Sequence, residues 1–305
     1  MDILIFIVAM GALIYGADFI IEQSEKIALR FDISPFIIGA TLVALGTSLP
    51  EMAVSMSASM QGSGDIAVAN VIGSTIFNIS LVLGAVFLIA KKVSPNRDLF
   101  AKDSAWSLFP ILIFILMSID GEISRLDGVL FLLLMAGYLL FLIQSNQVEE
   151  AETDDEKEKF AWTKTIGLLI VGFLFVVFGA DFAIQSAGNI ARDFGVSEWV
   201  IGLFLVAFGT SLPELTVAIK AARANNADMA IGAIIGSNVA NFTMVLGLSS
   251  LINPLNVDLS ANFFDIIAAL MVSVMLVFIT ANKLYNKSAG IVLLTVLALV
   301  VSNSF

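Results

Sequence analysis

The chain has 305 residues, of which 59% are hydrophobic and only 13% are charged, and its mean hydropathy is +0.98. Charged residues make up roughly a quarter of a soluble globular chain, so this composition excludes an ordinary soluble domain and indicates a membrane protein. There is no cysteine or histidine, which excludes disulfides, iron–sulfur clusters, thiol nucleophiles and the usual zinc ligand. The net charge of −11, with only 15 lysines and arginines, excludes nucleic acid as a partner.

Ten stretches are apolar enough to be predicted as membrane-spanning helices, which need about 20 residues each. They cover residues 2–22, 35–59, 66–89, 104–119, 126–143, 163–185, 198–219, 229–252, 263–281 and 288–303. The first stretch has no basic segment before it and recurs later in the chain, so we expect a mature helix and not a cleaved signal peptide. The predicted fold class is an all-α membrane protein.

The two halves of the chain repeat each other at the constant offset that separates Glu51 from Glu214. The matching runs are Gly16-Ala17-Asp18-Phe19 with Gly179-Ala180-Asp181-Phe182, Gly46 to Glu51 with Gly209 to Glu214, and Ile72-Gly73-Ser74 plus Asn78 with Ile235-Gly236-Ser237 plus Asn241. Each half holds five predicted helices, an odd number, so the second half must enter the membrane from the opposite side. This pattern predicts two inverted-topology five-helix repeats, over residues 1–143 and 163–305, joined by a linker over 144–162.

The orientation of the chain follows from its lysines and arginines, which favour cytoplasmic breaks between helices. Only Arg125 and Arg192 fall in even-numbered breaks. The odd-numbered breaks hold the others: Lys26, Arg30, Lys91, Lys92, Arg97, Lys102, Lys157, Lys159, Lys164, Lys220, Arg223, Lys283 and Lys287. We therefore expect a multi-pass protein of the cell membrane with both termini extracellular and the linker cytoplasmic.

The linker is strongly acidic, and a regulatory calcium sensor is one interpretation of its seven carboxylates. A calcium-binding loop needs ligands at fixed alternate positions and a sharp glycine turn, and neither occurs here. We interpret the segment as a solvated tether.

Two glutamates lie deep within predicted spans, Glu51 in the second and Glu214 in the seventh. A charged side chain at the bilayer centre costs roughly 2.5–3.5 kcal/mol even on the most lenient scale, and no lysine or arginine lies at matching depth. Inverted repeats bring equivalent residues together near the midplane. We expect the two glutamates to face each other there and to be neutralised by a mobile cation.

Polar groups around the glutamates could complete a cation site. Pro50 and Pro213 lack an N–H, so we expect carbonyls in the preceding turns, from Ala44 to Thr47 and from Ala207 to Thr210, to be free for a hard cation. Hydroxyls or carbonyls come from Thr47, Ser48, Thr210 and Ser211, and each of the pairs Ser74/Asn78 and Ser237/Asn241 lies on one helical face.

Each of these residues also has a structural interpretation. Serine and threonine in membrane helices usually bond to the preceding turn or join neighbouring helices, and an isolated proline kink is more often structural than functional. The recurrence of the whole set, at depth, in both halves favours ion binding. Asp18 and Asp181 also recur, but we expect them near helix ends, where capping or pairing is the simpler role.

These motifs resemble those of the cation/calcium exchanger superfamily, and within it the sodium/calcium exchangers of prokaryotic type. The resemblance covers nearly the whole chain and is carried by two long patterns. The first runs from Gly39 to Glu51 and is followed by Asn70 to Asn78. The second runs from Gly202 to Glu214 and is followed by Ile235 to Asn241.

The resemblance implies a ten-helix fold in which helices 2, 3, 7 and 8 form a core and helices 1 and 6 slide across it. It further implies that calcium binds Glu51, Glu214 and the backbone oxygens of Thr47 and Thr210. Sodium would use the same glutamates with Ser48, Ser74, Ser211, Ser237 and carbonyls near Ala44 and Ala207. Some relatives carry aspartate where Asn241 stands, so two asparagines make potassium dependence unexpected and leave one fewer titratable group.

We therefore expect a secondary antiporter, not an enzyme, that exchanges Ca²⁺ for Na⁺ in the lipid bilayer without a cofactor or an obligate protein partner. Three Na⁺ per Ca²⁺ is the expected ratio. The main alternative is a calcium/proton antiporter that works by protonation of Glu51 and Glu214. A channel fits inverted repeats with broken helices less well, and an intramembrane protease would leave the matching Ser and Asn pairs unexplained.

Overall fold

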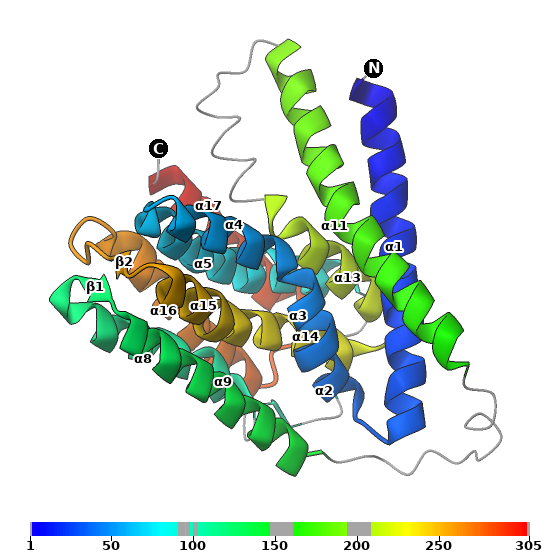
Figure 1. The fold of residues 1–305 in the computed structure, drawn as a ribbon. Helices are drawn as coiled ribbons and strands as arrows, with labels where there is room; N and C mark the ends of the chain where they lie inside the picture. Colours follow the sequence, from blue (N-terminus) through cyan, green and yellow to red (C-terminus); the bar gives the residue numbers. More distant parts are fainter. Residues whose placement is uncertain are drawn as a thin grey trace.

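The computed structural model describes residues 2–90, 95, 98–99, 103–146, 161–193 and 209–303 (Figure 1). Most of the linker and Ala207 therefore lie outside the described residues. The α-helices of the first half are α1 (Asp2–Phe31), α2 (Pro35–Ile38), α3 (Ala44–Thr47), α4 (Leu49–Met60), α5 (Gly64–Phe77), α6 (Gly84–Ile89), α8 (Phe109–Met117) and α9 (Arg125–Gln144). Between them lie the π-helical segments η1 (Gly39–Val43) and η2 (Asn78–Leu83) and the 3₁₀ segments η3 (Ser104–Ser107) and η4 (Ser118–Asp120). The helices of the second half are α11 (Trp162–Asp193), α13 (Leu212–Arg223), α14 (Ala227–Ala240), η5 (Asn241–Val245), α15 (Leu246–Ile252), α16 (Phe263–Ala281) and α17 (Lys287–Asn303). The strands β1 (Glu122–Ile123) and β2 (Leu255–Asn256) pair antiparallel, Glu122 opposite Asn256.

The helices agree with the expected membrane spans in most places. Within the described ranges, six helices are long and apolar enough to cross a membrane, and a seventh span is formed by Pro35–Thr47 and Leu49–Met60, which meet at a bend of 46°. Residues 104–120 and 287–303 form shorter apolar helices, as the sequence suggested. The predicted span over 198–219 lies partly outside the described residues.

The first and sixth predicted helices are much longer than their apolar stretches. α1 continues to Phe31 and α11 to Asp193, although hydropathy alone places their ends near residues 22 and 185. The added turns are polar and amphipathic, with Lys26 bonded to Glu22 one turn earlier, so they form helix without apolar character. Asp18 and Asp181 consequently lie well inside their helices, and the expectation that they mark helix ends is wrong.

α1 and α11 run side by side as a long antiparallel pair, apart from the rest of the bundle over much of their length (Figure 1). Asp2, at the start of α1, accepts a hydrogen bond from Asn189 near the end of α11. Small residues allow the two backbones to approach closely: Gly16 faces Gly172, and Gly179 faces Ala9. Gly179 is the repeat equivalent of Gly16, and Ala9 is the repeat equivalent of Gly172. The two contacts are therefore equivalent to each other, as a two-fold relation between the helices requires.

The internal repeat is visible in the ends of the helices. α4 and α13 begin and end at matching residues, and so do α5 and α14. A π-helical segment follows in both halves, beginning at Asn78 in η2 and at Asn241 in η5. The sequence repeat is therefore also a repeat of local structure.

Glycines bring α14 against α2 and η1 with almost no space between the backbones. A Cβ added to Gly39 would lie 2.4 Å from the carbonyl oxygen of Met229, and one added to Gly236 would lie 2.2 Å from that of Ala40. Any larger residue at these positions would overlap main-chain atoms. This contact packs the broken helix that leads to Glu51 against α14, and α14 in turn packs against α13, the helix of Glu214.

Candidate cation-binding site

Each glutamate follows a break in its helix that the sequence produces locally. Ser48 and Ser211 have nearly the same non-helical backbone, with φ/ψ of −82°/6° and −88°/1°. A new helix begins at the next residue in both halves, with proline in its first turn, where the missing N–H costs no intrahelical bond. Glu51 and Glu214 therefore occupy the first turns of α4 and α13, near the positive end of each helix dipole.

The break frees fewer carbonyls than the prolines suggested. The carbonyl of Ala44 accepts hydrogen bonds from the backbone N–H of Ser48, at 3.0 Å, and from the hydroxyl of Thr47, at 3.2 Å. The expectation that Ala44 loses its helical partner is therefore wrong. The Thr47 hydroxyl also donates to Val43, at 3.1 Å, so it is directed into its own helix.

Both carboxylates are buried and bonded by serines of their own half. Glu51 is 0% exposed and Glu214 is 4% exposed. The hydroxyl of Ser74 donates to Oε1 of Glu51 at 3.4 Å, and that of Ser237 donates to Oε1 of Glu214 at 3.1 Å. These two bonds are equivalent in the repeat, and the serines are those predicted from the sequence.

One further serine joins the halves. The hydroxyl of Ser48 donates to Oε1 of Glu214 at 3.2 Å and lies 2.5 Å from the hydroxyl of Ser237. The equivalent hydroxyl, on Ser211, is buried and has no hydrogen-bond partner. The Glu51 and Glu214 carboxylates are also near enough for their negative charges to repel each other. The site is thus shared between the repeats but is asymmetric in its hydrogen bonds.

Several buried oxygens at the site have no hydrogen-bond partner. They are Oε2 of Glu51, Oε2 of Glu214, Oδ1 of Asn78, Oδ1 of Asn241, Oγ1 of Thr210 and Oγ of Ser211. Buried polar atoms are nearly always paired, so such a set requires an explanation. Carboxylate, amide and hydroxyl oxygens are the ligands that hard cations prefer, and Ca²⁺ takes 6–8 of them. No cluster of three acidic or histidine side chains occurs in the described parts of the chain, so two charges dominate the site.

Two asparagines at the site were not predicted from the sequence. Asn70 donates to the backbone oxygen of Glu51 at 3.2 Å and to the Ser55 hydroxyl at 2.9 Å, which ties α4 to α5. Asn238 accepts a hydrogen bond from Asn78 at 3.1 Å. Neither recurs in the other half, where Ala233 and Thr75 stand, so the repeat of polar residues does not reveal them.

The recurring aspartates lie on the long helix pair and not at the site. Lys220 of α13 donates to Asp18 at 2.8 Å, and this ion pair is partly exposed. Asp181 accepts from Gln185, one turn further along its own helix, at 2.9 Å. Asp18 thus shows the pairing expected of it, whereas Asp181 is hydrogen-bonded to a neutral amide.

The chain matches the family model for the sodium/calcium exchanger protein over residues 1–144 and 164–305. It is 34% identical over 301 residues to the inner membrane protein YrbG of Escherichia coli, covering 95% of this chain and 92% of that protein. It is 30% identical over 334 residues to the sodium/calcium exchanger MaX1 of Methanosarcina acetivorans, covering 96% and 95%. The solved structure of the sodium–calcium exchanger NCX_Mj, soaked without Na⁺ and Ca²⁺, superposes with a TM-score of 0.85 at 32% identity, over 100% of this chain and 99% of that one. A family match over most of the chain, an exchanger-like fold and a buried two-carboxylate site agree, and the chain belongs to the sodium/calcium exchanger family.

Proposed function

We propose that this protein exchanges Ca²⁺ for Na⁺ across the cell membrane by alternating access at the site between Glu51 and Glu214. The buried pair of carboxylates, each with one unpartnered oxygen, carries this proposal. Two such charges repel each other, and among the described residues neither forms an ion pair with a lysine or arginine, so a bound cation is the partner that stabilises them.

The proposed ligands lie at the two helix breaks and on the helices packed beside them. Glu51 and Glu214 supply the charge, and neutral oxygens come from Thr47, Thr210, Ser48, Ser211, Ser74, Ser237, Asn78 and Asn241. One Ca²⁺ or two Na⁺ neutralise a site of charge −2, so the ions exclude each other. Mutual exclusion couples the flow of one ion to that of the other.

We further propose ten spans in two inverted repeats, with both termini outside and the linker over 144–162 in the cytoplasm. Contacts between breaks that this topology places on the same side of the membrane support it. Asn146, after the fifth span, bonds the backbone of Asp32 and Ser34, after the first. On the other face, the strands β1 and β2 join the breaks after the fourth and eighth spans. Breaks that follow odd-numbered spans thus contact each other, and so do breaks that follow even-numbered spans.

The proposed ratio of three Na⁺ per Ca²⁺ follows from the energy that export requires. Export against a ten-thousandfold gradient costs about 5.5 kcal/mol, and moving two charges against about 100 mV adds about 4.6. Each Na⁺ that enters down a tenfold gradient and the same potential releases about 3.7 kcal/mol. Two Na⁺ are insufficient and three suffice, so the exchange moves net charge.

The test is uptake of radioactive calcium into proteoliposomes under imposed sodium, potassium or proton gradients. We expect an outward sodium gradient to drive calcium uptake. A positive-inside potential should increase this uptake, because three Na⁺ leave the vesicle for each Ca²⁺ that enters and one net positive charge moves out. Equal uptake under a proton gradient in sodium-free vesicles would replace sodium by protons as the coupling ion. Sodium-driven calcium flux without any charge movement would contradict the 3:1 ratio.

A further inference from the structure

The two asparagines proposed as cation ligands occupy equivalent places in the repeat but have different surroundings. Asn78 donates from Nδ2 to Oδ1 of Asn238, on α14 of the other half, at 3.1 Å. Both side chains are buried, with exposed fractions of 0% and 1%. An amide held through its nitrogen presents its oxygen in one direction, and Oδ1 of Asn78 is buried without a hydrogen-bond partner.

No such contact holds Asn241. The residue that matches Asn238 in the first half is Thr75, whose hydroxyl donates to Val71 of its own helix at 3.0 Å. Both Nδ2 and Oδ1 of Asn241 are accordingly buried without partners. The first amide is fixed and the second is not, although both begin the same kind of π-helical segment.

We infer that Asn238 is a positioning residue that orients the Asn78 amide so that its oxygen is available to the transported cation. Asn238 lies directly after Ser237, which bonds Glu214, and Asn78 lies one turn after Ser74, which bonds Glu51. The hydrogen bond therefore links the two halves of the site, one residue away from the serine that bonds Glu214 and one turn away from the serine that bonds Glu51. This inference rests on the proposed function, because it needs Asn78 as a ligand.

A double-mutant cycle in proteoliposomes tests the inference, with sodium-driven calcium flux as the measurement. Asn238→Ala should raise the apparent KM for calcium about three- to tenfold and leave the maximal rate within about twofold. In the Asn78→Ala background the same change should add nothing, because Asn238 acts only through Asn78. Thr75→Ala is the matched control and should leave KM within about twofold.

Equal effects of Asn238→Ala in both backgrounds would overturn the positioning role. So would a normal KM in Asn238→Ala beside a raised one in Asn78→Ala. A normal KM in Asn78→Ala would instead remove Asn78 from the ligands, and absence of calcium flux in the unaltered protein would refute the proposed function itself.

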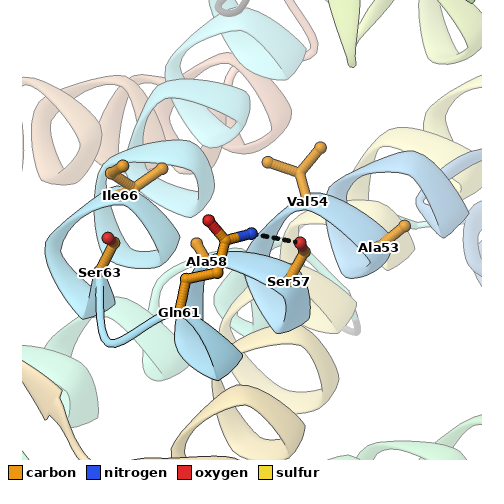
Figure 2. A pocket seen from close by; sticks show the side chains of 7 residues that line it. All are labelled: Ala53, Val54, Ser57, Ala58, Gln61, Ser63 and Ile66. Carbon is orange, nitrogen blue, oxygen red and sulfur yellow. Dashed lines mark hydrogen bonds between the residues drawn. The ribbon is translucent and has the colours of Figure 1, made fainter.

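A second, independent observation concerns the faces of α4 and α13. The helix α13 packs against α1. Its Val217 is 1% exposed, whereas the equivalent Val54 of α4 is 37% exposed. Beside Val54 lies a groove of about 430 Å³ between α4 and α5, which Figure 2 shows with Val54 and Ile66 on opposite sides and Gln61 bonded to Ser57. The α1–α11 pair thus rests on one of two equivalent helices.

The ion pair of α1 follows the same asymmetry. Asp18 bonds Lys220 of α13, whereas the equivalent Asp181 of α11 bonds Gln185 of its own helix. The residue of α4 that matches Lys220 is Ser57, in the wall of the groove. A shift of the pair to the equivalent position would bring Asp181 toward a hydroxyl and not toward a cation.

We propose that α11 packs into the groove beside Val54 when the site opens to the other side of the membrane. We further propose that the Asp18–Lys220 ion pair, which has no equivalent at Asp181, acts as a latch that holds α1 on α13. The latch favours the conformation in which α1 covers α13. An exposed ion pair is worth little, so we expect it to bias the equilibrium by up to about fivefold. This proposal also rests on alternating access.

Thiol labelling tests the latch cleanly, because the chain has no cysteine. Val54→Cys and Val217→Cys, each introduced alone, report how open the two faces are to a small methanethiosulfonate in detergent solution. Adding Lys220→Ser should speed labelling at position 217 and slow it at position 54. Ser57→Lys, which gives Asp181 a partner, should act in the same direction, and Asp18→Asn should match Lys220→Ser.

Reciprocal changes at the two positions would support the latch. Unchanged rates would overturn it, as would changes of the same sign at both positions, which indicate general loosening of the bundle. Because labelling does not require transport, this result stands apart from a failure of the proposed function.

Discussion

The charge of the site is tested by replacing each glutamate with glutamine, which keeps its volume and its oxygen for the bonds from Ser237 or Ser74. At roughly 4 Å and an effective dielectric constant of about 20, one unit charge attracts another by about 4 kcal/mol. Losing one carboxylate should therefore weaken Na⁺ binding about a thousandfold and Ca²⁺ binding far more. Both Glu51→Gln and Glu214→Gln should abolish sodium-driven calcium uptake.

The same variants have an expected effect on stability that separates loss of charge from misfolding. The two buried carboxylates repel each other, so removing one should raise the melting temperature of the ion-free protein, and added calcium should no longer raise it further. Glu122→Gln on β1, an exposed acid remote from the site, is the matched control and should transport normally. Calcium uptake within about tenfold of the unaltered protein in either site variant would refute the reasoning.

Three further predictions concern stability in detergent. Calcium at a hundred times its Kd should stabilise the folded protein by about 2.7 kcal/mol, and excess sodium should remove the effect in a thermal-shift assay; stabilisation by both ions together would contradict a shared site. Gly236→Ala should lower the free energy of unfolding by about 1–3 kcal/mol because its Cβ would meet backbone, whereas Gly73→Ala, its repeat equivalent with open space around it, should be neutral or stabilising by up to about 1 kcal/mol; equal losses would disprove the close contact. Ser124→Ala should cost about 1 kcal/mol through loss of the capping box of α9, while Ser63→Ala, at an N-cap without a side-chain bond, should cost less than half as much in chemical unfolding, and the reverse order would refute the assignment.

The carboxylates, their serines and the helix breaks were predictable because each leaves a signal that does not depend on packing. A glutamate within an apolar stretch is conspicuous whatever surrounds it, and the proline that follows Ser48 or Ser211 removes a backbone donor and so kinks or breaks the helix. Recurrence in both halves then separated these residues from ordinary polar residues of membrane helices.

Features that depend on tertiary contact, or that occur in one half only, could not be predicted in this way. Asn238 has threonine as its match, so the repeat conceals it. The partner of the Ala44 carbonyl depends on the exact backbone at Ser48, which a proline two residues later does not determine. The lengths of α1 and α11 depend on polar turns that hydropathy reads as loop.

The π-helical segments at Asn78 and Asn241 set a limit on changes of chain length. A π-turn is an α-helix with one residue inserted, so every side chain beyond it is rotated by about 100° relative to the turns before. Deleting a single residue from either segment would restore the ordinary turn and redirect the rest of that helix to a different set of neighbours. Helices that tolerate many substitutions on their lipid-facing sides are therefore intolerant of one missing residue at these two points.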